Sequence, residues 1–138
     1  MKEAVLGLGE KIKADDGVGR YVVDKLRRKK DKRLLLHSPV PENAFNKLRG
    51  KGIEKLTIVD AADFNGQPGE FIEVTGFNER ARLSTHSTSI TNLVRYIRES
   101  IGIKDVSILL VQAKNLDFGG KMSPEIKMAG DKIVELLS

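Results

Sequence analysis

Nearly continuous apolar runs alternate along this chain with segments in which apolar residues recur at the spacing of an α-helix. A short apolar run is typical of a parallel strand that is buried on both faces, and the helical segments supply the layers that cover it. The pattern therefore predicts an α/β layered domain with a mostly parallel sheet. The runs that predict its strands are residues 5–8, 34–36, 56–61 and 106–111.

Helices are predicted between these strands and after the last of them. Ser123 is expected to be the N-cap of the final helix, because Pro124 suits the first helical position and Glu125 complements the helix dipole. Glycines or basic residues follow the other helical segments and mark their ends. The earlier helices are expected at about residues 17–30, 42–51 and 90–101.

A further strand is predicted at residues 70–75, directly after the turn sequence Asn65-Gly66-Gln67-Pro68-Gly69. The connection from the strand at 56–61 is short, whereas a parallel crossover needs a dozen or more residues. We therefore expect these two strands to pair as an antiparallel hairpin. A polar loop is expected to follow at residues 76–86.

Composition limits the class of protein. The chain has 138 residues, which favours a single domain over residues 1–138. It contains no Cys, so disulfides, thiolate zinc sites and cysteine nucleophiles are excluded. No apolar run is long enough to span a bilayer and no signal peptide precedes the first strand, so we expect a cytoplasmic protein without a membrane partner.

The net charge of +5 raises the alternative of nucleic-acid binding. Much of the excess lies in the segment 27–33, where the first helix is expected to end. Cations at a helix C-terminus complement the helix dipole, and no aromatic residue is interleaved with them for base stacking. We therefore expect no nucleic-acid partner.

Three stretches bring residues with metal-binding side chains to the ends of apolar runs or into polar turns. Asp15 and Asp16 follow the first strand, Asp60 ends the third, and His86 lies in the polar stretch 84–89. The carboxyl ends of neighbouring strands in an open α/β sheet meet at one crevice, where ligands bind. Two carboxylates and an imidazole there could hold a divalent first-row metal or activate a water.

Each of these residues also has a structural alternative. Asp15 and Asp16 precede the helix that contains Val18, so either could cap it. Asp60 could bond the next turn, and His86 could cap a helix at the surface. His37 follows a buried strand and is interpreted as structural. Gly7 and Gly9 resemble part of a dinucleotide fingerprint, but its third glycine is missing.

Taken together, these segments resemble the hydrogenase maturation endopeptidases, which trim the large subunit of nickel–iron hydrogenases. The resemblance covers nearly the whole chain. Two features, Val40-Pro41-Glu42-Asn43 and the strand ending at Gln112, are closest to the HycI-type branch. The blocks that carry it are Val5-Leu6-Gly7-Leu8-Gly9 with Asp15-Asp16-Gly17-Val18-Gly19, then Ile58-Val59-Asp60-Ala61-Ala62-Asp63 with Pro68-Gly69-Glu70, then Ser84-Thr85-His86.

The resemblance implies a twisted three-layer α/β/α sandwich and a metal site formed by Asp16, Asp60 and His86. It implies a peptidase, conventionally of the aspartic type, that removes the C-terminal extension of a nickel-loaded large-subunit precursor. Asp16 or Asp60 would activate the water, and whether a carboxylate pair or the metal performs the chemistry stays open. The nickel would be supplied by the precursor, so no tightly bound resident metal is expected.

The chain departs from the family pattern at two places. Glu10 stands where the family usually has Asn, and Leu36-His37-Ser38 stands where it usually has Asp-Gly-Gly in a loop that flanks the cleft. The second departure motivates an alternative function, a non-catalytic checkpoint or chaperone that binds the nickel-loaded subunit without cutting it.

Overall fold

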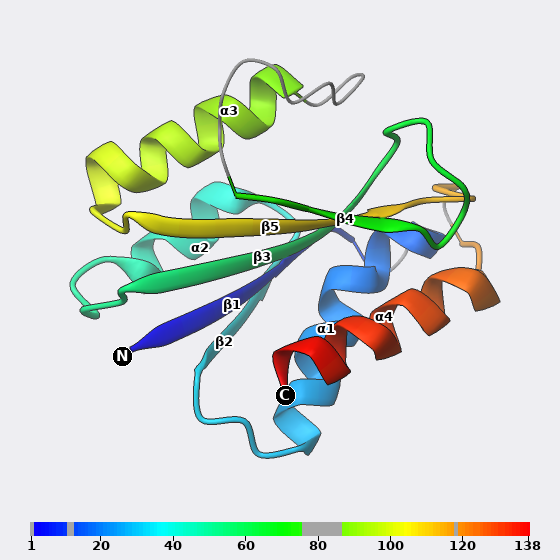
Figure 1. Cartoon of the computed structure of the whole chain (residues 1–138), viewed down its shortest axis with the longest axis horizontal. Helices are drawn as coiled ribbons and strands as arrows, with labels where there is room; N and C mark the ends of the chain where they lie inside the picture. Colours follow the sequence, from blue (N-terminus) through cyan, green and yellow to red (C-terminus); the bar gives the residue numbers. More distant parts are fainter. Residues whose placement is uncertain (1, 11–12, 76–86, 118) are drawn as a thin grey trace.

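A computed structural model of the chain describes residues 2–10, 13–75, 87–117 and 119–138, except for the side chains of 87–91. Strands and helices alternate in the order that the sequence predicts (Figure 1). The strands are β1 (Glu3–Leu8), β2 (Leu34–Ser38), β3 (Lys55–Ala62), β4 (Phe71–Val74) and β5 (Asp105–Gln112). The helices are η1 (Ala14–Gly17, a 3₁₀ turn), α1 (Val18–Arg28), α2 (Pro41–Leu48), α3 (Ser87–Tyr96), η2 (Ile97–Ile101, a π-helical turn) and α4 (Pro124–Leu137).

The strands form one sheet in the order β2-β1-β3-β5-β4. β1, β2, β3 and β5 are parallel, and β4 runs antiparallel to β5 at one edge. The expected hairpin between the strands at 56–61 and 70–75 is therefore wrong, because β4 pairs with β5. β3 has no free edge for β4, since β1 occupies one side and β5 the other.

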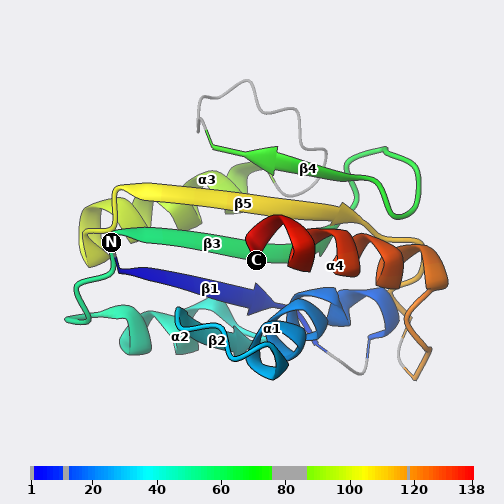
Figure 2. The same cartoon turned by 60° about the horizontal axis from the view of Figure 1, so that its bottom comes forward.

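Helices cover both faces of the sheet, which gives the three layers that the family resemblance implies. Figure 2 shows α1 and α4 in front of the sheet and α3 behind it. Side chains alternate between these layers along β3: Ile58 packs beneath α2 and α3, and Val59 packs beneath α1 and α4. Burial on both faces explains why the central strands read as continuous apolar runs. Among the described residues, no helix has the length and apolar character that crossing a bilayer requires.

Glycines let helix α1 approach the sheet unusually closely. A Cβ at Gly19 would lie 2.6 Å from the carbonyl oxygens of both Leu8 and Val59. A Cβ at Gly7 would lie 2.3 Å from the carbonyl oxygen of Gly19. The glycines of the opening block thus have a packing role, as they bring the first turn of α1 against the carboxyl ends of β1 and β3.

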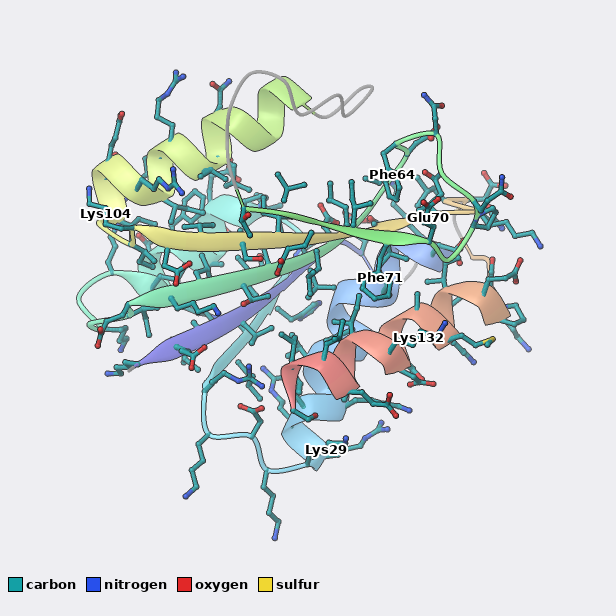
Figure 3. All side chains as sticks on the ribbon, in the orientation of Figure 1. Lys29, Phe64, Glu70, Phe71, Lys104 and Lys132 are labelled. Carbon is teal, nitrogen blue, oxygen red and sulfur yellow. The ribbon has the colours of Figure 1, made fainter. Side chains whose placement is uncertain are left out.

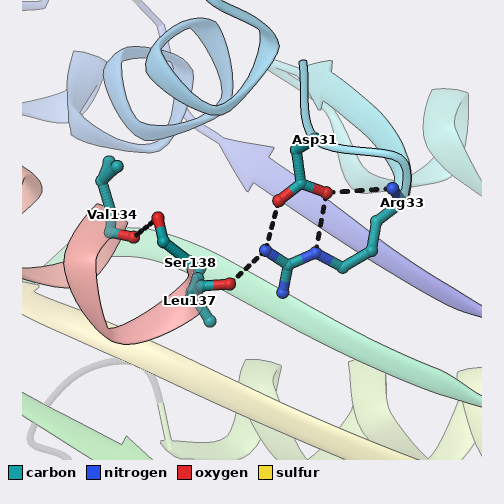
Figure 4. A network of polar contacts seen from close by, with 5 residues as sticks. All are labelled: Asp31, Arg33, Val134, Leu137 and Ser138. Atoms are coloured by element: carbon teal, nitrogen blue, oxygen red, sulfur yellow. Dashed lines mark hydrogen bonds and ion pairs between the residues drawn. The ribbon is translucent and has the colours of Figure 1, made fainter. Parts of the chain in front are cut away.

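The ends of α4 are fixed by contacts with distant parts of the chain. At its C-terminal end, Asp31 accepts hydrogen bonds from the backbone N–H and the guanidinium of Arg33, and the guanidinium also donates to the carbonyl of Leu137 (Figure 4). This part of the basic segment 27–33 is therefore structural. Lys25, Arg27 and Arg28 lie in the last turn of α1, as the sequence predicts.

Candidate functional site

The sheet reverses its winding between β1 and β3. The chain leaves β1 for α1 on one face, and it returns to β3 from α2 on the opposite face. Such a switch point leaves a crevice outside the carboxyl ends of the two strands, where α/β proteins bind ligands. Asp16 follows β1 and Asp60 lies near the end of β3, so both predicted carboxylates are at this crevice.

Asp60 lines a cavity of about 790 Å³ between the sheet and helices α2 and α3. It is still paired with Leu110 of β5, so the sheet holds its backbone in place. Its side chain shares a face with Ile58, as expected from strand alternation. Most of the cavity wall is apolar and comprises Leu8, Phe45, Ala62, Leu93, Tyr96 and Leu110.

The surroundings of Asp60 disfavour its ionised form. Burial and the nearby negative charge of Asp16 raise the pKa of Asp60 to about 7, although a hydrogen bond from the Ala61 N–H acts in the opposite direction. That bond is 2.9 Å long and reaches Oδ1. A carboxyl with this pKa takes up and releases protons near neutral pH, which suits a general acid or base.

Asp16 is held against the end of β1. Its Oδ2 accepts a 2.9 Å hydrogen bond from the backbone N–H of Glu10. Gly9 has φ +112°, and a Cβ there would lie 2.1 Å from the carbonyl oxygen of Asp16 and 2.9 Å from its Oδ1. Only glycine fits this position. Because Glu10 contacts Asp16 through its backbone, the departure from the usual Asn leaves this hydrogen bond in place.

Asp15 and Asp16 have different environments. Asp15 is fully buried, and its carboxylate accepts hydrogen bonds from the N–H groups of Lys114, Asn115 and Ser123 and from the Ser123 hydroxyl. Neither carboxylate caps a helix, since η1 and α1 have no side-chain cap hydrogen bond. The capping alternative is therefore wrong for both residues. Ser123 is the N-cap of α4 by position, but its hydroxyl donates to Asp15.

The third predicted site residue, His86, lies outside the described residues, so the trio with Asp16 and Asp60 stays a prediction. The same holds for the polar loop predicted at 76–86. Within the part of the chain that the structure describes, no group of three His, Cys, Asp or Glu side chains could hold a metal ion.

The segment Leu36-His37-Ser38 is strand and not loop. β2 continues through Ser38, two residues beyond the predicted end, because His37 and Ser38 pair with Gly7 and Leu8 of β1. The side chain of His37 is half-buried, and burial with the nearby Arg20 lowers its pKa. None of the three residues lines the cavity beside Asp60.

Sequence reasoning missed the role of Gln112, which organises the loop after β3. Its buried side-chain oxygen accepts hydrogen bonds from the N–H groups of Phe64 (2.8 Å) and Gly66 (3.0 Å). Its side-chain nitrogen donates to Asp63 and to the carbonyl of Ala113. Figure 3 shows Phe64 and Glu70 on this loop, at the end of the sheet opposite Lys104. The signal that could have indicated this role in the sequence is a polar residue, Gln112, directly after the apolar run 106–111.

Comparisons with known proteins agree on one family. The family model HycI, hydrogenase maturation protease, matches residues 22–138. A candidate hydrogenase maturation protease of Methanocaldococcus jannaschii is 30% identical over 99% of this chain and 86% of its own length. The hydrogenase 3 maturation protease of Escherichia coli K12 is 28% identical over 99% of this chain and 89% of its own length. The crystal structure of the NiFe hydrogenase maturation protease HycI from Thermococcus kodakarensis superposes with a TM-score of 0.83 at 26% identity, covering 99% of this chain and 89% of that chain.

Proposed function

Because this chain belongs to the hydrogenase maturation protease family, we propose that it cleaves the C-terminal extension from a nickel-loaded nickel–iron hydrogenase large-subunit precursor. In this proposal Asp16, Asp60 and His86 bind the nickel that the precursor carries. The precursor is the protein partner, and nickel is part of the substrate and not a resident cofactor of the protease.

The observation that carries the proposal is the unfavourable ionisation of Asp60 beside Asp16. Two neighbouring carboxylates repel each other, and here burial and the charge of Asp16 raise the pKa of Asp60 to about 7. A divalent cation in the crevice would relieve this repulsion and favour the ionised form of both. A precursor without nickel lacks that cation, so productive binding would depend on completed nickel insertion.

The same residue supports a route to hydrolysis. A general base works best when its pKa lies near the operating pH; Asp60 meets this requirement in the cation-free protein, and the bound cation then favours the ionised form that accepts the proton. In the proposed reaction Asp60 removes a proton from the attacking water, and the nickel of the precursor polarises the scissile carbonyl. The alternative to polarisation by nickel is an aspartic-type reaction. In that reaction Asp16 and Asp60 activate the water without help from the metal.

The cavity beside Asp60 supports binding of a peptide segment. Its volume of about 790 Å³ lies within the range of ligand-binding pockets in proteins. Polar groups at its wall, Glu42, Asn46 and Asn92, could orient a peptide backbone, while the apolar wall excludes water from the scissile bond.

The test is cleavage of a nickel-loaded precursor in vitro, followed by the mass of the large subunit. We expect the wild-type protein to shorten the loaded precursor and to leave the nickel-free precursor intact. Asp16→Asn and Asp60→Asn should each abolish cleavage, whereas the control Asp24→Asn, at a half-buried carboxylate on α1, should cleave at the wild-type rate. Binding of the loaded precursor without loss of mass would refute the peptidase proposal and favour the checkpoint function. Rapid cleavage by Asp60→Asn would remove Asp60 from the mechanism.

A further inference from the structure

Asp15 has an environment that the proposed reaction does not explain. It is 0% exposed, and the four donors to its carboxylate among the described residues are uncharged groups. Oδ2 accepts from the N–H groups of Lys114 (2.8 Å) and Asn115 (2.7 Å) and from the Ser123 hydroxyl (3.0 Å). Oδ1 accepts from the Ser123 N–H (2.7 Å). A buried carboxylate with this many hydrogen bonds fixes its neighbours strongly, because removing any bond leaves a buried polar group unpaired.

These bonds join the short turn η1 to two elements in the last quarter of the chain. Lys114 and Asn115 follow the end of β5, and Ser123 is the N-cap of α4. The backbone reinforces the connection, because the N–H of Asp15 donates to the carbonyl of Asn115 over 2.9 Å. Asp15 therefore fastens η1 to both ends of the loop between β5 and α4.

Asp16 is the next residue of the same four-residue turn. The residue before Asp15, Ala14, has φ +48°, a left-handed conformation that alanine rarely adopts and that needs support from its surroundings. The loop supplies that support, since Gly120 lies against Ala14 so closely that a Cβ at Gly120 would be 3.2 Å from the Ala14 Cβ. Without the bonds of its carboxylate, Asp15 would be joined to this loop through its backbone N–H alone among the hydrogen bonds of the described residues.

We propose that Asp15 is a positioning residue: its buried hydrogen bonds hold η1 in the orientation that presents the Asp16 carboxylate to Asp60 and to the incoming cation. The effect on cleavage rests on the proposed function. The effect on the position of Asp16 does not, and it can be measured in the protein alone.

The discriminating variant is Asp15→Asn. Asparagine has nearly the same size but only one acceptor oxygen, and both carboxylate oxygens of Asp15 face N–H donors. Whichever way the amide turns, its NH₂ group meets a donor. Asp31→Asn is the matched control, because the Asp31 carboxylate also accepts several hydrogen bonds, here from Arg33, whose guanidinium donates to Leu137 at the opposite end of α4 (Figure 4).

The first measurement is the amide spectrum of the ¹⁵N-labelled protein. The N–H of Glu10 donates to Asp16 and reports its position. Asp15→Asn should shift the Glu10 resonance and speed its hydrogen exchange, whereas Asp31→Asn should leave both unchanged. If Asp15→Asn left the Glu10 amide as it is in the wild type, the positioning role would be refuted.

The second measurement is cleavage of the nickel-loaded precursor at a temperature where every variant is folded. Changing a residue that orients a metal-binding side chain lowers metal affinity or activity by about 10- to 100-fold, and we expect a loss of kcat/KM in this range for Asp15→Asn. Asp31→Asn should retain the wild-type value. Equal losses in both variants would show that Asp15 acts only through stability and would overturn the proposal.

Two further variants keep the outcomes separate. If Asp15→Asn does not fold, Ser123→Ala carries the test, because it removes one of the four hydrogen bonds and should shift the Glu10 amide in the same direction by a smaller amount. A Glu10 amide unmoved in that variant would refute the proposal. If the wild-type protein does not shorten the loaded precursor while Asp15→Asn shifts the Glu10 amide, the proposed function fails and the positioning of Asp16 stands.

Discussion

Ionisation of the Asp60 carboxyl group lowers the stability of the folded state. Its pKa in the folded protein is about 7, above the ordinary value of 3.8, because of burial and the charge of Asp16. The folded state therefore binds the proton more tightly than the unfolded state does. The resulting stability is fully present below pH 3.8 and is lost as the pH rises to about 7, at up to about 1.4 kcal/mol per pH unit.

Replacing Asp60 with Asn should remove this loss, since the amide resembles the protonated carboxyl. At pH 8 we expect Asp60→Asn to be more stable than the wild type by about 2 kcal/mol or more, with little difference at pH 4. Urea unfolding at both pH values measures the effect. The exposed Asp105→Asn serves as the control and should show no such pH dependence. An equal difference at both pH values would contradict the raised pKa.

Gly19 gives a second prediction for a single residue. Alanine normally stabilises a helix relative to glycine by about 1 kcal/mol. At Gly19 its Cβ would lie 2.6 Å from two backbone carbonyl oxygens that the sheet holds in place. We therefore expect Gly19→Ala to lower the free energy of unfolding by about 2–3 kcal/mol, as overpacking does. Arg20→Ala, on the exposed side of the same helix, should change it by less than about 0.5 kcal/mol. A stabilised Gly19→Ala would refute the close packing.

The different roles of Asp15 and Asp16 could not be predicted from the sequence. Both are acidic residues after a strand, and local spacing treats them alike. The difference arises from partners of Asp15 that lie 99 to 108 residues further along the chain. Asp60 could be placed at the crevice because its position depends only on its own strand, although β3 continues two residues beyond it to Ala62.

Among the elements, the positions of the strands along the chain were predicted well, whereas the pairing of β4 in the sheet was predicted wrongly. A short connection correctly indicated that β4 runs opposite to β3, because no crossover fits in it. The sequence between them holds no information about which strand β4 pairs with. That choice depends on β5, which follows α3 in the sequence. β5 pairs with the edge of β3 that β1 leaves open, and β4 then pairs with the other edge of β5.

The loop after β3 should depend on one side chain of β5. In Gln112→Ala the N–H groups of Phe64 and Gly66 lose their acceptor, so we expect a loss of about 2–3 kcal/mol in the free energy of unfolding. Hydrogen exchange at these two amides should become faster. Gln67→Ala, in the same loop but exposed, should do neither. Unchanged hydrogen exchange at the Phe64 and Gly66 amides in Gln112→Ala would show that the loop is stable without the hydrogen bonds to Gln112, and would contradict the prediction.

For the molecule as a whole, the sequence predicted the layers and the edge of the sheet at which ligands would bind. Parallel strands buried on both faces need helices on both sides, and their carboxyl ends share one edge. The cavity beside Asp60 was not predictable. It depends on how side chains of α2 and α3, such as Phe45 and Tyr96, leave space above the sheet.

The response of the whole protein to metal follows from the number of expected ligands. Two carboxylates and one imidazole leave coordination positions open, unlike structural sites, which four protein ligands usually close. We expect a chelator to leave the melting temperature unchanged and excess Ni²⁺ to raise it by mass action. Calorimetry with and without chelator, and metal analysis after dialysis, provide the measurement. Stoichiometric metal that survives a strong chelator would mean a resident metal centre and would refute nickel supplied only by the precursor.

The hydrogen bonds of Asp15 also have a consequence for the order of synthesis. A chain is made from its N-terminus, so Asp15 and Asp16 leave the ribosome long before Ser123 and the residues after β5. Until those residues arrive, η1 lacks the partners that fix it. The nascent chain thus carries Asp15 and Asp16 for most of its synthesis without their final geometry. The proposed cleavage would therefore begin only when the fold of the protease itself is nearly complete.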